Sequence, residues 1–342
     1  MTQVAPVKQR IAFLDNARYW LMLVVVIAHT ITTVRSVSEF ANGLYIWIYT
    51  FHMPVFILIS GYTSRNYSGT PAQMRRTVTS LLLPYLLVET TLQMLMRHYR
   101  GAPDPLAILT PYWLGWFIIA LFMWRIATPF FRILRYPILT SIGISLLVGL
   151  IEVPNVLALP KVLTLFPFYI VGMHLTMEHF EKLRHTWVRV SAVALLVLTF
   201  IGTQLWSKNF VASWLLWKHR YDESPLNVGP LEGIAIRAGL LALSFLMVAA
   251  ILALIPWRTM WTTEMGSRTV YTYLLHGYVI LILVEEFDFF RRVAENGFWP
   301  LVTMLIGALI LANLLMTRTT QKIFRPIIEP NQKWMFKKDL VS

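Results

Sequence analysis

The chain has 342 residues, of which 57% are hydrophobic and only 14% are charged. A soluble domain carries roughly a quarter charged residues, so too few polar side chains are present here to cover a surface that faces water. The net charge of +13 would suit a nucleic-acid ligand in a soluble protein, but basic residues of membrane proteins gather on the cytoplasmic side. We therefore expect a protein embedded in lipid, with no nucleic-acid partner.

The sequence contains no cysteine. Disulfides, thiolate metal sites and palmitoylation are therefore excluded. A cysteine-acyl intermediate is excluded for the same reason.

Ten apolar segments predict an all-α bundle of about ten transmembrane helices, since a crossing takes about 20 residues. The segments lie at 18–36, 43–62, 78–98, 112–131, 137–152, 161–176, 187–206, 231–255, 268–287 and 297–316. The first follows Lys8 and Arg10 as a secretory signal would, but it holds His29 and no small-residue cleavage site. We interpret it as a retained helix.

The distribution of lysine and arginine predicts the orientation. With the N-terminus inside, 20 of the 30 basic residues fall in cytoplasmic segments, which favours cytoplasmic N- and C-termini. We expect a cytoplasmic segment at 1–17, a transmembrane domain at 18–316 and a basic cytoplasmic tail at 317–342, in the cell membrane.

The longest predicted connection, 207–230, combines aromatic and charged residues on the outer side. It includes Trp214, Trp217, Lys218 and Tyr221. Rings beside charged groups suit sugar binding, and they suit an interfacial aromatic belt equally well.

The first helix carries the clearest set of candidate functional residues. Arg18 and His29 are eleven positions apart, so they share one face of a helix with a rise of about 16 Å between them. Asp15 lies three residues before Arg18. Ionisable groups inside a membrane are costly and mark function. The alternatives are an anchoring role for Arg18, an N-cap for Asp15 and a structural hydrogen bond for His29.

The second helix adds His52, which we expect at the depth of His29, and Pro54, which predicts a kink. Two imidazoles at one depth suit a proton relay, an acid/base pair or metal ligation. A metal would need a third ligand, for which Glu89 and His276 are candidates. Nothing in the spacing requires one, and we expect no metal.

Two motifs make the sequence resemble the membrane acyltransferase-3 family, and more narrowly its fucose 4-O-acetylase-like branch. They are Phe13-Leu14-Asp15-x-x-Arg18-x10-His29 and Phe51-His52-Met53-Pro54-x-Phe56-x-x-x-Ser60-Gly61-Tyr62. Later segments resemble the family too, namely Trp116-Phe117-x-x-x-Leu121-Phe122, Arg75-Arg76 before Leu83-Pro84-Tyr85, and Tyr273-Leu274-Leu275-His276-Gly277. The resemblance covers residues 10–316. The sequence departs from the family at Thr79 and Ser80, where a second arginine is common.

The resemblance implies acyl transfer from acetyl-CoA, or another acyl-CoA, to a hydroxyl of a sugar or glycan. Arg75, Arg76 and Arg18 would bind the phosphates of the donor. His29, kept neutral by burial, would be the general base, with Asp15 orienting Arg18 and His52 holding the acceptor or stabilising the oxyanion. A covalent acyl-histidine step stays open. Ser60, Trp116, Glu89 and His276 are further candidates.

A proton-coupled secondary transporter is the alternative. Its proton relay would be His29, His52 and Glu89. Such transporters usually contain inverted repeats and paired broken helices, and the sequence shows neither.

Overall fold

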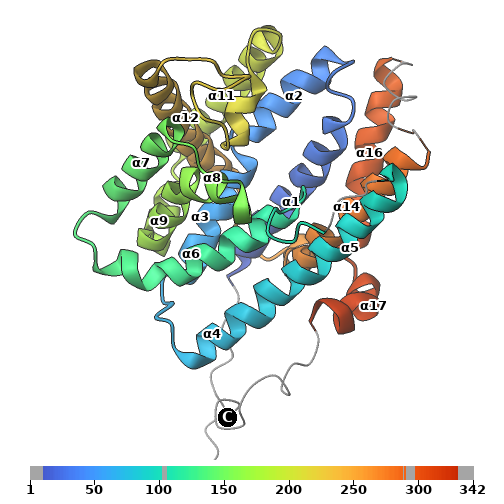
Figure 1. The fold of residues 1–342 in the computed structure, drawn as a ribbon, viewed down its shortest axis with the longest axis horizontal. Coiled ribbons are helices and arrows are strands. Elements are labelled where there is room, and N and C mark those ends of the chain that lie inside the picture. Colours follow the sequence, from blue (N-terminus) through green and yellow to red (C-terminus); the bar gives the residue numbers. More distant parts are fainter. Residues whose placement is uncertain (1–10, 102–105, 288, 290–296, 330–342) are drawn as a thin grey trace, which may run out of the picture.

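The computed structural model describes residues 11–101, 106–287, 289 and 297–329, and every regular element in these ranges is a helix. Figure 1 shows a bundle with α2 toward its upper end and with α4 and α17 at its lower end. The main helices are α1 (Ala12–Thr32), α2 (Glu39–Tyr49), α3 (His52–Ser64), α5 (Leu83–Arg100), α6 (Gly115–Ile133), α7 (Pro137–Leu147), α9 (Phe166–His174), α11 (Thr186–Trp206), α12 (Pro230–Leu254), α14 (Thr269–Glu285) and α16 (Phe298–Leu315). The shorter ones are α4 (Pro71–Thr77), the π-helix η1 (Val78–Leu82), α8 (Leu159–Thr164), α10 (Met177–Lys182), α13 (Trp261–Gly266), α17 (Arg318–Ile328) and the 3-10 turns η2 (Val148–Leu150), η3 (Val156–Ala158) and η4 (Ala212–Leu216).

Seven helical stretches are long and apolar enough to cross a membrane. They are 12–32, 39–64, 71–99, 115–133, 186–206, 230–254 and 298–315. A pair of helices bent by 59°, 156–164 and 166–174, is an eighth candidate, and two shorter apolar helices occupy 137–150 and 269–285. The prediction of an all-helical membrane protein is confirmed, whereas ten crossings with both ends inside stay a prediction.

The surfaces of α11 and α16 are those of lipid-facing helices. Their exposed side chains are largely apolar, and they include Val190, Val193, Val197, Leu198, Ile201 and Leu205 on α11 and Ile306, Ile310 and Leu314 on α16. Apolar patches of this extent are rare on monomeric soluble proteins. Hydrocarbon therefore covers them.

The predicted termini lie partly outside the described residues, since 1–10 and 330–342 are not among them. The first helix begins at Ala12 rather than at residue 18. The start of the predicted tail, α17, packs on the bundle, where Ile328 is buried and the Tyr271 hydroxyl donates to Glu329 over 2.9 Å.

The second predicted helix is divided into α2 and α3. Pro54 has no N–H to donate to the carbonyl of Thr50, and Phe51 takes non-helical angles of φ −134° and ψ −29°. The break makes His52 the first residue of α3, and its Nδ1 donates to the carbonyl oxygen of Ile48 over 2.9 Å. The break thus fixes one of the predicted imidazoles.

α3 and α9 pack backbone against backbone. A Cβ on Gly61 would lie 2.0 Å from the Tyr169 carbonyl oxygen, and one on Gly172 would lie 2.0 Å from that of Leu58. Each helix therefore needs a glycine where the other approaches, which gives Gly61 of the Ser60-Gly61-Tyr62 motif a packing role.

The start of α1 is hydrogen-bonded to α13 and to the segment that precedes it. The buried Asn16 donates to the carbonyls of Pro256 and Arg258 over 2.8 and 2.9 Å. Its side-chain oxygen accepts from the Thr263 hydroxyl over 2.6 Å. These bonds fix the end of α1 that carries Asp15 and Arg18.

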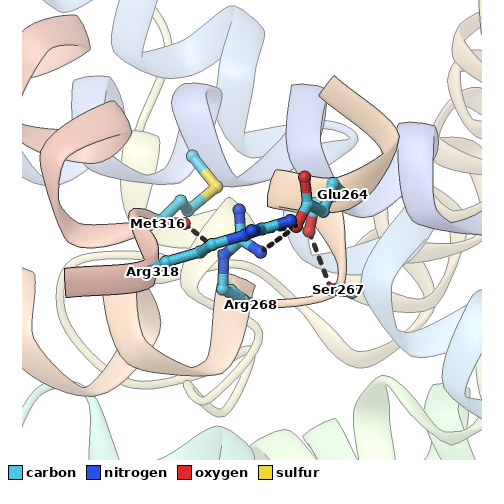
Figure 2. A network of polar contacts seen from close by, with 5 residues as sticks. All are labelled: Glu264, Ser267, Arg268, Met316 and Arg318. Carbon is cyan, nitrogen blue, oxygen red and sulfur yellow. Dashed lines mark hydrogen bonds and ion pairs between the residues drawn. The ribbon is translucent and has the colours of Figure 1, made fainter. Parts of the chain in front are cut away.

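A polar network ties α13 and α14 to the junction of α16 and α17 (Figure 2). Glu264 accepts from Arg318 Nε over 2.7 Å and from Arg268 Nη1 over 3.1 Å. Arg268 Nε also donates to the Met316 carbonyl over 2.6 Å. The two guanidinium groups, Arg318 foremost, lower the pKa of the Glu264 carboxyl. The network anchors the lower end of α14, the helix that carries His276.

Candidate functional site

Two cavities meet beside α1. The first, the Arg18 cavity, has a volume of about 190 Å³ and is lined by Arg18, Met22, Val25, Met53, Phe56, Ile59, Ser60, Ser80, Leu81, Pro84, Phe117, Ile118, Leu121, Thr269, Val270, Tyr273 and Leu274. The second, the His29 cavity, has a volume of about 390 Å³. Its wall includes His29, Arg35, Tyr45, Tyr49, His52, Trp113, Trp116, Lys161, Trp217 and Lys218.

A thin partition separates the two cavities. Val25, Met53, Phe117 and Tyr273 line both of them. Arg18 lines one cavity and His29 lines the other. The two residues are about 16 Å apart along the axis of α1, and the partition lies between them.

Arg18 enters its cavity with a carboxylate partner. Arg18 Nη1 lies 2.9 Å from Asp15 Oδ1, and the Asp15 side chain is buried. A carboxylate within this distance restricts the guanidinium to one orientation. Ser60 lines the same cavity, although its hydroxyl donates to the Phe56 carbonyl over 2.8 Å.

Two of the three predicted donor arginines lie outside the cavity wall. Arg75 and Arg76 belong to α4, and the next turn, the π-helix η1, places Ser80 and Leu81 in the wall instead. π-helical turns are rare and occur frequently at functional sites. Arg75 and Arg76 therefore do not line the Arg18 cavity.

His29 is bonded to His276, which lies 247 positions away in the sequence. His29 Nδ1 and His276 Nε2 are 2.8 Å apart, and the two rings are stacked with an angle of 9° between them. His276 Nδ1 lies 2.7 Å from the Thr272 carbonyl oxygen.

This chain of contacts determines the tautomers of both neutral rings. A carbonyl oxygen only accepts, so His276 carries its proton on Nδ1 and presents an unprotonated Nε2. His29 must then donate from Nδ1. Its Nε2 is left unprotonated and able to accept a proton, the state that a general base requires.

His52 lines the same cavity as His29. Its Nδ1 donates to Ile48, so the neutral ring also presents an unprotonated Nε2. Within the described ranges, no three histidine or carboxylate side chains gather closely enough to hold a metal ion.

Glu89 is buried but does not line either cavity. Its Oε1 accepts from the backbone N–H of Tyr112 and from Gln93, each over 2.6 Å. The next residue, Trp113, has a φ of +41°, a strained conformation for a side-chain-bearing residue, and its ring lies 5.1 Å from that of His29. Glu89 therefore fixes the loop that places Trp113 against His29.

Part of the wall of the His29 cavity is aromatic and basic. The Lys161 ammonium lies 4.7 Å above the Trp116 ring, and the Arg35 guanidinium lies 4.3 Å above Tyr45. Rings that stack on sugar faces and cations that bind oxygen atoms are both present.

Residues 11–317 match the acyltransferase-3 family, described as an acyltransferase domain. The chain belongs to this family. It is also similar to the nodulation protein NolL of Sinorhizobium fredii (strain NBRC 101917 / NGR234), with 26% identity over 290 residues, which cover 78% of this chain and 76% of that protein. No solved structure matches the chain.

Membership of the acyltransferase-3 family makes this chain a membrane acyltransferase. The narrower resemblance to the fucose 4-O-acetylase-like branch stays a prediction.

The interpretation of the 207–230 connection as an interfacial aromatic belt is wrong. Trp214, Trp217 and Tyr221 are all buried in the protein, so these three rings do not form an interfacial belt. Tyr221 donates to the Leu146 carbonyl over 2.7 Å, and Trp217 and Lys218 line the His29 cavity. The connection folds inward and completes the site.

Sequence reasoning missed Arg35 and Lys161 as site residues. Both residues enter the prediction of the orientation only as basic residues of the outer side, although Lys161 begins the sixth predicted helix. Its position at the edge of an apolar segment was the available signal. The partnership of His29 with His276 had no local signal.

Proposed function

We propose that this membrane acyltransferase is an O-acyltransferase that moves an acetyl group from acetyl-CoA to a sugar hydroxyl, with His29 as general base. The observation that carries the proposal is the chain from the Thr272 carbonyl through His276 to His29. It holds His29 in the tautomer that can take a proton, at the wall of a cavity with room for a small acceptor.

The reaction follows from this geometry. His29 Nε2 takes the proton of the acceptor hydroxyl as its oxygen attacks the thioester carbonyl. The new C–O bond forms, the C–S bond breaks, and the coenzyme A thiolate leaves with the proton that His29 accepted. General-base catalysis of this kind typically contributes 10²–10⁴-fold.

The donor would occupy the Arg18 side. Coenzyme A is cytosolic and polyanionic, and Arg18 faces the cavity with its orientation fixed by Asp15. Arg75 and Arg76 would add phosphate contacts at the entrance. The slender thioester arm would cross the apolar partition toward His29.

The acceptor would occupy the His29 side. His52 would accept a hydrogen bond from an acceptor hydroxyl through Nε2. The same tautomer, with Nδ1 donating to Ile48, has no proton on Nε2 to offer an oxyanion. We therefore propose that His52 holds the acceptor rather than stabilising the oxyanion.

The test uses purified protein, acetyl-CoA with a labelled acetyl group, and a mixture of sugars. We expect a base-labile labelled ester on a sugar and one free coenzyme A thiol for each ester formed. Proteoliposomes that accumulate intact sugar, with no ester in any fraction, would instead indicate the transporter.

A further inference from the structure

The wall of the His29 cavity contains basic side chains from three separate parts of the chain, and no carboxylate of the described residues lines it. Arg35 follows α1, Lys161 lies in α8, and Lys218 follows η4. None of the three forms an ion pair with a carboxylate that the structure describes.

Three arginines elsewhere in the bundle have partners within the protein. Arg18 is paired with Asp15. Arg237 donates to the carbonyls of Ser145 and His219 over 3.3 and 2.8 Å, and Arg268 is bonded to Glu264 and Met316. A charge removed from water without a partner is costly, so the basic groups of the His29 cavity differ from these three arginines.

Two buried donors in the cavity wall lack a hydrogen-bond partner. They are Arg35 Nη1 and Trp217 Nε1. Buried donors of this kind are rare in native proteins and call for an explanation. A ligand that brings oxygen acceptors into the cavity would supply the missing partners.

The positive charges also act on one another. Lys161 and Lys218 line the same wall and repel one another. A bound anion would relieve this repulsion. Lys218 also lines a neighbouring cavity that contains Glu152 and Glu223, so Arg35 and Lys161 carry the argument.

We propose that the acceptor is an acidic sugar, whose carboxylate or phosphate group is bound by Arg35 and Lys161 while a hydroxyl reaches His29. The inference rests on the proposed function and names the substrate class of the same site. The Trp116 ring beneath Lys161 would stack on the sugar face.

The test measures sugar binding to the full protein in lipid nanodiscs by equilibrium dialysis with two matched pairs. They are methyl glucuronide against methyl glucoside, and glucose 6-phosphate against glucose. The acidic member of at least one pair should bind about tenfold tighter, the contribution of a charge-assisted hydrogen bond. The first pair reports a carboxylate and the second a phosphate.

Variants locate the effect. Lys161→Gln and Arg35→Gln should remove the preference for the acidic sugar and leave the affinity for its neutral twin unchanged. Lys208→Gln is the control, because Lys208 is paired with Glu39 at 2.6 Å and does not line the cavity. This variant should show the same preference for the acidic sugar as the unmodified protein.

Two binding results would overturn the inference. One is equal affinity for both members of both pairs. The other is a weakened affinity for acetyl-CoA in Lys161→Gln, which would assign the cations to the donor phosphates. Equal ester formation on acidic and neutral sugars would leave the proposed function standing and remove the inference. Tight binding of acidic sugars with no ester formed on any sugar would remove the proposed function, and with it the role of the acidic sugar as acceptor.

Discussion

Two regions of the bundle differ in how their basic side chains are partnered. At the lower end, Arg268 and Arg318 share the Glu264 carboxylate, and Arg18 is paired with Asp15. In the His29 cavity, Arg35 and Lys161 lie above aromatic rings and have no described carboxylate partner. Complete networks hold helices together, whereas incomplete ones leave binding capacity for a ligand.

The ring nitrogens of the histidines show the same contrast between atoms that are paired within the protein and atoms that remain available to a ligand. The Nδ1 atoms of His29, His52 and His276 all have a partner within the protein. Among the residues that the structure describes, the Nε2 atom of His276 has a partner, His29, whereas those of His29 and His52 have none. His276 is thus a positioning residue, and His29 and His52 keep an atom for the substrate.

The largest expected effect is that of His29→Gln. Glutamine keeps hydrogen-bonding ability but cannot take a proton near neutral pH, so transfer should fall at least ~10²-fold. Folding should survive, since one lost hydrogen bond costs about 1–3 kcal/mol. Turnover and the thermal unfolding midpoint measure the two effects. His52→Gln, in the same cavity, should chiefly raise the KM for the sugar. Near-normal turnover of His29→Gln would leave His29 a structural role only.

A second prediction ranks the donor arginines. Arg18 lines its cavity and Arg75 and Arg76 do not, so Arg18→Gln should raise the KM for acetyl-CoA by about tenfold. The double replacement of Arg75 and Arg76 by Ala should raise it less. Both changes should affect kcat less than they affect the KM for acetyl-CoA, because phosphate contacts are made equally in the ground and transition states. An unchanged KM in Arg18→Gln would place the donor elsewhere.

A third prediction concerns the bond between His276 and His29. His276→Ala removes the acceptor that selects the tautomer of His29, so kcat should fall by about tenfold with an unchanged KM for acetyl-CoA. His276→Gln supplies an amide oxygen in place of Nε2 and should recover part of the loss. A loss of the same size in both variants, together with a lowered unfolding midpoint, would make His276 a packing residue.

The smallest effect is expected at Glu264. Its pKa is lowered in the folded protein by Arg318 and Arg268, so its contribution to stability is present above the unfolded pKa of about 4.3 and is lost as the pH falls through the lower folded value. Glu264→Gln should lower the unfolding midpoint slightly at neutral pH, and the difference should shrink on acidification. Ser267→Ala removes a hydroxyl that bonds only the Glu264 backbone and should show no such pH dependence. A pH-independent difference for Glu264→Gln would exclude the charge as its cause.

The sequence predicts the all-helical fold because each crossing is encoded locally by a run of apolar residues. The break at His52 is similarly local, since Pro54 alone prevents the hydrogen bond. The joint position of Arg18 and Asp15 follows from helical periodicity.

The remaining parts of the site depend on tertiary contacts. His29 meets His276 across 247 positions, and no periodicity links two helices so distant in sequence. Arg35 and Lys161 lie at the ends of predicted helices, and the sequence does not reveal that the 207–230 connection brings Trp217 and Lys218 into the same cavity wall. Glu89 is a relay candidate from the sequence alone, because the sequence does not reveal that the backbone N–H of Tyr112 donates to its carboxylate.

The central claim, that donor and acceptor approach His29 from opposite ends of one path, is tested most directly by sidedness. Proteoliposomes of uniform orientation would receive labelled acetyl-CoA on the side of Arg18 and sugar on the side of His29. We predict labelled ester on the sugar side, none when the two substrates are exchanged, and none with His29→Gln in either arrangement. Equal ester formation in both arrangements, or ester only when both substrates share one side, would contradict the claim.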